Sequence, residues 1–123
     1  VIQSKSSVDA GKIALNTLIQ YDTPPDAIFS SSDFAALGAI QELRAREINI
    51  PADFCVAGFS NEPFTKFMEL SITSVDQSPL EMGKMAARVF LEQMDKTDKI
   101  MIEKKVVLKP ELHIRKSSAR STH

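Results

Sequence analysis

Two short apolar runs with one helical pattern between them constrain the fold more than any other feature of this chain. The runs are Ala27–Asp33 (AIFSSSD) and Cys55–Glu62 (CVAGFSNE), and each ends abruptly in small polar residues. Between them, residues 34–46 place apolar side chains along one helical stripe. Strand, helix and strand with short loops favour parallel pairing through a right-handed crossover. Because parallel strands open into ligand crevices at their carboxyl ends, we expect both polar tips at one edge of a sheet.

The other elements follow local signals. We expect them at residues 7–20 (helix), 61–68 (short helix or turn), 72–75 (strand), 79–94 (helix), 95–99 (charged loop), and 100–108 and 111–115 (strands). The clearest signal is Ser78–Glu81, in which Ser precedes Pro at the first helical position and Glu follows three residues later, as in a capping box. The tail after residue 115 is predicted to be frayed, and the basic cluster Arg115, Lys116 and Arg120 to be solvated.

Composition limits the broad class of protein. The 123 residues are 43% hydrophobic and 25% charged, which suits one soluble globular domain. The formal net charge of -1 gives no support for nucleic-acid binding by these residues themselves. No apolar run approaches the roughly 18–20 residues of a membrane span. The single cysteine, Cys55, lies in an apolar run, so we expect a buried, inert thiol, compatible with a reducing compartment.

The sequence lacks a convincing catalytic or metal-binding constellation. Its only histidines are His113 and His123, too few and too scattered for a metal site. The serines at 30–32 have no neighbouring base, as a nucleophile would require. The four glycines are dispersed, so no phosphate-binding loop is expected. We therefore predict a protein that is not an enzyme and carries no cofactor or metal.

The polar tips remain as candidate chemistry. Hydroxyl, amide and carboxylate groups at 30–33 and 60–62 suit a polyol, a sugar or a nucleoside-like ligand. The alternative is that Ser32 and Asp33 only cap a helix, while Ser60 and Asn61 only form a turn. Gln77, between a strand and a helix cap, is either a ligand contact or a polar hinge residue. The methionine-rich face of residues 79–94 is interpreted as core packing, with a partner groove as the alternative.

An ordered succession of motifs resembles the effector-binding region of LacI/GalR-family bacterial transcription regulators. The matching stretches are residues 25–33, 36–40, 50–53, 56–61, 72–79 and 82–83, and their order and spacing agree from about residue 7 to 117. The resemblance implies a periplasmic-binding-protein-like type I fold, an α/β fold with a parallel sheet flanked by helices. The chain would be the C-terminal subdomain plus a crossover segment.

The resemblance also implies a division of the chain. Residues 1–71 would form most of the C-terminal subdomain. Residues 72–99 would be a crossover strand and a helix that normally packs in the N-terminal subdomain, residues 100–117 would return, and 118–123 would be a tail. The first residue is Val1 rather than Met, so we expect a piece of a longer protein, without the DNA-binding head of the family.

Six positions match ligand-binding positions of the family: Phe29, Ser32, Asp33, Ser60, Asn61 and Gln77. Phe29 matches a position that stacks on the ligand, and Gln77 matches the crossover position that lines the cleft. Ser60 stands where many members have an aspartate, and a neutral hydroxyl accepts weaker hydrogen bonds than a carboxylate. Asn61 or Glu62 would then compensate.

The function implied is sensing of a small, sugar-like effector by a cytoplasmic, homodimeric regulator, such as a repressor, that binds operator DNA only through the missing head. The helix at 34–46 resembles one that contributes to the dimer interface of the family. The alternative is a periplasmic sugar-binding protein of the same fold that serves transport. We also expect this chain alone to bind effector weakly, and to self-associate or reposition the 79–94 helix, because that helix has an apolar face without cover.

Overall fold

The computed structural model describes residues 1–95 and 103–121. Four helices and four strands follow one another in the order α1 (Val8–Ile19), β1 (Ala27–Phe29), α2 (Asp33–Ala45), β2 (Cys55–Phe59), α3 (Phe64–Phe67), β3 (Thr73–Asp76), α4 (Pro79–Met94) and β4 (Glu111–His113). The expected strand–helix–strand unit is therefore present, and the bounds of the long helices match the sequence pattern closely.

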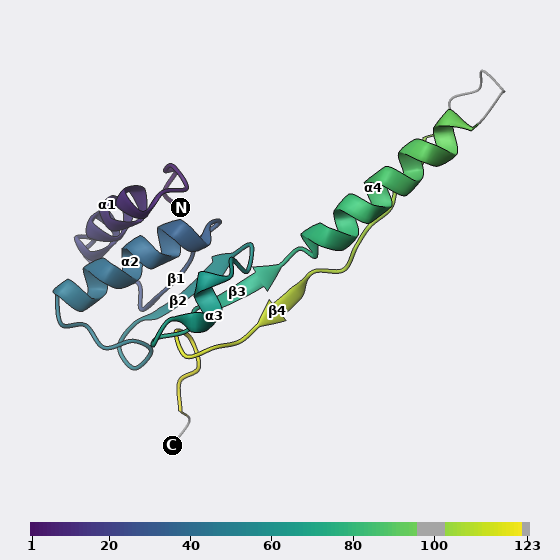
Figure 1. The fold of residues 1–123 in the computed structure, drawn as a ribbon. Coiled ribbons are helices and arrows are strands. Elements are labelled where there is room, and N and C mark those ends of the chain that lie inside the picture. The colour runs from purple at the N-terminus through teal and green to yellow at the C-terminus, as the bar shows by residue number, and fades with distance from the viewer. Residues whose placement is uncertain (96–102, 122–123) are drawn as a thin grey trace.

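The strands form one mixed sheet in the order β1-β2-β3-β4 (Figure 1). β1, β2 and β3 are parallel, with Ile28 opposite Val56 and Gly58 opposite Ser74, and β4 runs antiparallel to β3. The backbone hydrogen bonds continue past the strand ends, since Ser30 N donates to Ala57 O (2.8 Å). The predicted parallel α/β arrangement, with the two polar tips on neighbouring strands, is confirmed.

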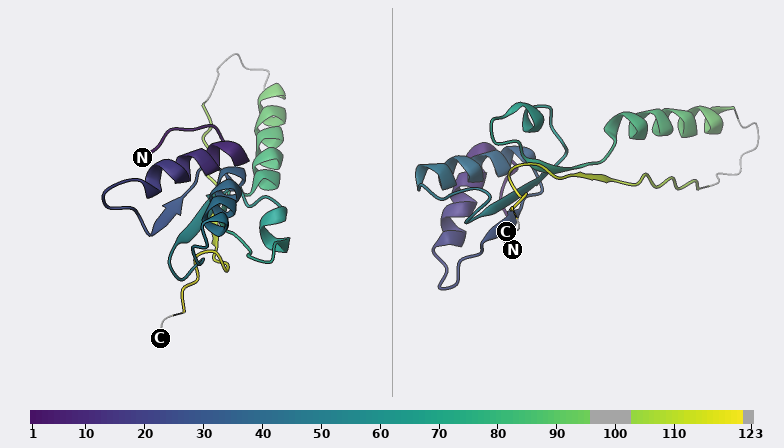
Figure 2. Two further views of the ribbon diagram at one scale, coloured as in Figure 1. Left: turned by 90° about the vertical axis from the view of Figure 1, so that its left-hand side faces the viewer. Right: turned by 90° about the horizontal axis from the view of Figure 1, so that it is seen from below.

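α1 and α2 lie side by side and touch through their backbones (Figures 1 and 2). A Cβ atom on Gly11 would lie 2.0 Å from Ala35 O, and one on Gly38 would lie 1.9 Å from Val8 O. Only glycine permits this approach. The small residues in the opening turns of α2 therefore serve contact between helices of the same chain.

The core lies between these helices and the sheet. Its buried side chains are Leu15, Ala36, Ala39, Ile40, Leu43, Phe54, Val56, Leu70 and Ile72. They come from α1, α2, β2 and the segments next to the strands, so the core belongs to residues 1–76 together with 111–121, which we call the body. None of the helices in the described ranges has the length and apolar composition of a membrane span.

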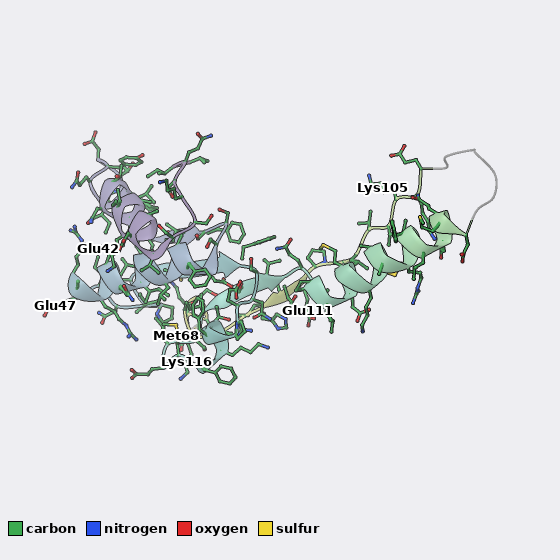
Figure 3. The ribbon with its side chains drawn as sticks, turned by 45° about the horizontal axis from the view of Figure 1, so that its top comes forward. Glu42, Glu47, Met68, Lys105, Glu111 and Lys116 are labelled. Carbon is green, nitrogen blue, oxygen red and sulfur yellow. The ribbon has the colours of Figure 1, made fainter. Side chains whose placement is uncertain are left out.

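α4 projects away from the body, and the returning segment runs back beside it (Figures 1 and 2). We call residues 77–95 and 103–110 the arm. Glu111 lies where the arm meets the body, and Lys105 lies towards its far end (Figure 3). No residue of α4 is buried. The expected core packing of its methionine-rich face is therefore not found within the described chain. That face instead borders a groove of about 500 Å³ shared with Val106 and Leu108.

The predicted capping box at Ser78 is wrong. Ser78 adopts a left-handed conformation (φ 54°, ψ 56°) and its side chain makes no capping hydrogen bond. Only its carbonyl oxygen accepts a bond from Met82 N, at 2.9 Å. The chain turns sharply at this residue on leaving β3, which takes the hydroxyl away from the helix N-terminus.

The predicted strand at 100–108 is wrong over its described part, because residues 103–108 pair with no strand. Of the described return segment and the residues that follow it, β4 alone joins the sheet. Residues 96–102 lie outside the described ranges, as does most of the expected charged loop. The alternating pattern at 100–108 instead places Val106 and Leu108 against α4, and Lys104 Nζ pairs with the Glu92 carboxylate at 2.6 Å.

The tail is ordered rather than frayed over residues 116–121. Ser117 is fully buried, and its hydroxyl donates to Val56 O (2.6 Å) and accepts from Thr73 N (2.9 Å). Arg120 donates to Pro51 O at 2.9 Å. The tail is held because it satisfies backbone groups at the starts of β2 and β3. Residues 122 and 123 are outside the described part. Cys55 is half-buried rather than buried, with its Sγ 3.4 Å from Pro51 O.

Candidate functional site

The candidate site is the edge of the sheet formed by the carboxyl ends of β1, β2 and β3. Ser30 continues the β1–β2 ladder, and Ser60 N donates to Val75 O at 2.9 Å, continuing the β2–β3 ladder. Ser60 and Asn61 both have positive φ values, of 111° and 52°. The tip after β2 therefore turns sharply across the ends of its neighbours.

Phe29 presents an aromatic surface at this edge. It is 64% exposed, and its ring meets the Phe59 ring edge-on, with centroids 6.4 Å apart and planes at 83°. Phe29, Ser30 and Ser31 also border a groove of about 480 Å³ between the N-terminal segment, α1 and β1. An exposed ring held by a second ring is suited to stacking on a planar or apolar ligand face.

Ser32 caps α2. Its hydroxyl accepts from Phe34 N (3.2 Å) and donates to Ser6 O (3.3 Å), and the residue is only 8% exposed. Ser30 supports this turn by donating to Ser32 O at 2.8 Å. The hydrogen bonds of Ser32 therefore fit its interpretation as a helix cap. Ser31, at the same tip, is exposed.

Asp33 is a buried node between three segments. It is 1% exposed, its Oδ1 accepts from the Ser74 hydroxyl (2.7 Å) and its Oδ2 accepts from Glu62 N (2.8 Å). A Cβ on Gly58 would lie 2.2 Å from Asp33 Oδ1, so glycine makes room for the carboxylate. The N-terminus of α2 favours this negative charge. Asp33 thus fixes the β2–α3 loop and β3 relative to α2.

Asn61 is engaged at both ends of its side-chain amide. Its Nδ2 donates to Asp76 Oδ2 at 2.9 Å, and its Oδ1 accepts from Arg115 Nη2 at 2.6 Å. Its backbone N–H donates to the Ser74 hydroxyl at 2.9 Å. The sequence suggested that Asn61 compensates for the weaker hydrogen bonding of Ser60. To do so, Asn61 would have to use a side-chain amide that already bonds Asp76 and Arg115. Ser60 itself is half-buried at the tip.

Asp76 and Arg115 are partners that the sequence interpretation missed. The Asn61 amide and the Ser78 backbone N–H hold the pKa of Asp76 below its ordinary value, with a smaller contribution from His113, whose Nε2 lies 3.9 Å away. Arg115 also donates to Thr65 Oγ1 (3.0 Å) and to Ile72 O (2.7 Å).

The expectation that Arg115 is solvated is therefore wrong. The partners of its guanidinium group are 43 to 54 residues away in sequence, so no local signal predicts them. For Asp76, the one signal in the sequence was its position at the end of a strand, directly before Gln77. Gln77 is half-buried where the chain leaves β3 for α4.

The edge offers hydroxyl, amide and aromatic groups. Over residues 1–95 and 103–121, no three His, Cys, Asp or Glu side chains gather as metal ligands would. The arrangement can accept and donate neutral hydrogen bonds and stack one ligand face. These are the properties of a small-molecule binding edge at the carboxyl ends of parallel strands.

The sequence profile of the periplasmic binding protein-like domain matches residues 2–118, so the chain belongs to that family. The HTH-type transcriptional repressor CytR of Escherichia coli strain K12 is 34% identical over 86 residues, covering 70% of this chain and 25% of CytR. The chain thus spans about a quarter of the length of this curated relative.

Solved structures agree with the family. A LacI-type transcription regulator from Bifidobacterium animalis subsp. lactis superposes with a TM-score of 0.82 at 28% identity, covering 93% of this chain and 40% of that one. A LacI family transcriptional regulator from Lactobacillus casei with bound sucrose gives 0.75 at 27% identity, covering 91% and 41%. The resemblance to LacI-type regulators predicted from the sequence is confirmed.

Proposed function

We propose that this chain is the effector-sensing part of a LacI-type transcription regulator, and that it binds a neutral sugar or sugar derivative at the carboxyl edge of its sheet. The observation that carries the proposal is the juxtaposition of the β1 and β2 tips on paired parallel strands. Phe29 supplies a surface for the apolar face of a sugar ring. Ser31, Ser60 and Gln77 supply hydroxyl and amide groups for its oxygen atoms.

The charge at the edge supports a neutral ligand. Two of the carboxylates at this edge are already engaged within the protein, Asp33 by the Ser74 hydroxyl and the Glu62 backbone N–H, and Asp76 by the Asn61 amide and the Ser78 backbone N–H. By the family resemblance, Ser60 would stand where many members have an aspartate, which leaves a neutral hydroxyl at this point of the tip. The sucrose bound to the similar Lactobacillus casei regulator is also a neutral sugar.

The division of the chain is part of the proposal. Residues 1–71 would form most of the C-terminal subdomain, 72–99 would cross to the N-terminal subdomain, 100–117 would return, and 118–123 would follow as the tail. The projecting arm supports this division, because no residue of α4 is buried within the described chain. The apolar face of this helix would pack in the second subdomain of the longer protein.

The proposed mechanism is a shift between conformations. The effector would bind between two subdomains and favour one closure, which requires different effector affinities in the two states. A cytoplasmic homodimer would transmit the change to operator DNA through its DNA-binding head. No bond is made or broken, in line with relatives that are repressors. A transport protein is the alternative, and the description of CytR as a repressor favours regulation.

Titration of the isotope-labelled chain with sucrose, followed by backbone amide NMR, tests the proposal. We expect weak binding, because the chain supplies one wall of the cleft, and shifts concentrated at residues 29–31, 60–61 and 77. Phe29→Ala should abolish them. Phe67→Ala, a control at an 84% exposed ring in α3, should leave them unchanged. Glucose 6-phosphate serves as the charged comparison. Shifts only with the phosphate, or shifts clustered away from the edge, would overturn the proposal.

A further inference from the structure

A continuous chain of hydrogen bonds joins the tip after β2 to the point where the arm leaves the body. It runs from Arg115 to Asn61, from Asn61 to Asp76, and from Asp76 to Ser78. The distances are 2.6, 2.9 and 2.7 Å. The sequence interpretation assigned Asn61 to the ligand and Arg115 to solvent, so neither assignment explains this arrangement.

Asn61 is held in one orientation by this chain. Its Oδ1 faces the donor Nη2 of Arg115, and its Nδ2 faces the acceptor Oδ2 of Asp76. Rotating the amide by 180° would oppose donor to donor and acceptor to acceptor. Its backbone is left-handed (φ 52°), a conformation in which asparagine is among the best-tolerated residues.

Asp76 connects the tip to the arm because its two oxygens have different partners. Oδ2 accepts from Asn61 and Oδ1 accepts from the backbone N–H of Ser78. Ser78 is the left-handed residue at which the chain changes direction into α4. The carboxylate is 28% exposed, so both bonds are partly shielded from water.

Two connections join α4 to the body within the described residues. One is the turn at Ser78, and the other is the return segment, which enters β4 at Glu111, opposite Asp76. None of the residues of α4 is buried, and the described part of the return segment runs beside it. The bond from Ser78 to Asp76 therefore lies where the arm leaves the body, at the same residue that pairs with the start of β4.

We propose that Asn61 is a positioning residue, which couples the ligand tip to the direction of the arm through Asp76 and Ser78, with Arg115 fixing its amide. A ligand that draws the Ser60–Asn61 turn towards itself would move Nδ2 relative to Asp76 and loosen the hold on Ser78. The link to a ligand rests on the proposed function, whereas the hold on the arm does not.

An exchange of side chains between the two positions tests the coupling. Asn61→Asp alone sets two carboxylates against each other. Asp76→Asn alone sets an amide NH₂ against the Asn61 NH₂, or else gives up the bond to Ser78. The double variant reverses the polarity of the central bond and restores every link. The new carboxylate at 61 accepts from Arg115 and from the new amide at 76, whose oxygen accepts from Ser78. Formal net charge is unchanged in the double variant.

The direction of the arm is read by pulsed electron-spin distance measurement. Spin labels go on cysteines that replace exposed alanines, Ala45→Cys at the end of α2 and Ala87→Cys in α4, in a Cys55→Ser background. Dilution with unlabelled chain removes distances between molecules. We expect one narrow distribution for the native pair and the double variant, and a broadened or shifted one for each single variant. Asp53→Asn, a control that alters a pair with Asn49 far from the arm, should leave the distribution unchanged.

Native-like distributions in both single variants would overturn the coupling, and so would a double variant as broad as the singles. The measurement needs no sugar, so its result is independent of whether the edge binds one. Repeating it with sucrose separates the two proposals. A shift in the native chain that disappears in the single variants supports both, whereas intact coupling without any effect of sucrose counts against the sugar proposal alone.

Discussion

The Asp33 carboxylate lies 2.7 Å from the Ser74 hydroxyl and is almost completely buried. A residue at the first turn of a helix thus reaches across the sheet to a strand 41 positions later. Asp33→Ala would remove the acceptor for Ser74 and for Glu62 N. We expect the free energy of unfolding to fall by about 3 kcal/mol, since two bonds to a charged group are lost and their buried partners remain.

Urea denaturation measures this effect, and Asp53→Ala is the matched control. Asp53 pairs with Asn49 at the surface, so its loss should cost less than about 1 kcal/mol. Equal losses in the two variants would show that Asp33 is not the internal node described above.

Substitution of glycine by alanine should have opposite effects in α2, which contacts α1, and in α4, which has open space around its glycine. Gly38→Ala would place a methyl group 1.9 Å from Val8 O and force the helices apart. Gly83→Ala meets nothing within 4 Å and improves helix propensity in α4, so it should stabilise that helix by about 0.5–1 kcal/mol. Circular dichroism during thermal unfolding should show a lower midpoint for the first variant and no loss for the second.

Stability should depend on Asp76 at acid pH. Its pKa is lowered in the folded chain by Asn61 first and Ser78 second. The folded state therefore binds fewer protons than the unfolded state between the two pKa values, and stability rises with pH there. The contribution is complete above the unfolded value, about 3.9, and is lost as pH falls through the lower folded value.

Denaturation midpoints measured from about pH 5 to about pH 2.5 should show this slope in the native chain and a shallower one in Asp76→Asn. Asp22→Asn, at an exposed position in the α1–β1 loop, is the control. Identical slopes for Asp76→Asn and the native chain would exclude this contribution.

The apolar face of α4 predicts self-association of the chain. Met82, Phe90 and Met94 are 47%, 61% and 69% exposed, and solvent-exposed apolar surface favours association. Size-exclusion chromatography with light scattering should give a mass above the 13.6 kDa of one chain at high concentration. Phe90→Ser should shift the equilibrium towards monomer, and Lys84→Ser on the same helix should not. A clean monomer at all concentrations would contradict the expectation.

Local sequence patterns predicted most of the fold. Apolar periodicity located α1, α2 and α4, and the abrupt polar ends of two apolar runs located the tips beside each other. The pattern failed at Ser78, where the Ser-Pro-x-Glu signal for a cap is overridden by the turn out of β3. It also failed at 103–108, where alternation reflects packing against a helix rather than pairing in a sheet.

The partners of the site residues were beyond prediction from local pattern. Asp33 and Asn61 are polar residues at strand ends, which suits both a ligand contact and an internal node. The difference lies in Ser74 and Arg115, which the fold brings to them from distant parts of the sequence. Phe29 was proposed through the family resemblance alone, and its exposure in the structure accompanies its place at the end of β1.

The hydrogen bonds of the Ser117 hydroxyl join segments far apart in sequence, so they form late in the synthesis of the chain. The carbonyl of Val56 and the N–H of Thr73 pair with a hydroxyl that is synthesised 61 and 44 residues later. The arm must therefore be synthesised before these hydrogen bonds at the starts of β2 and β3 can form. Until then, the Val56 carbonyl and the Thr73 N–H lack the hydroxyl that pairs with them in the folded chain.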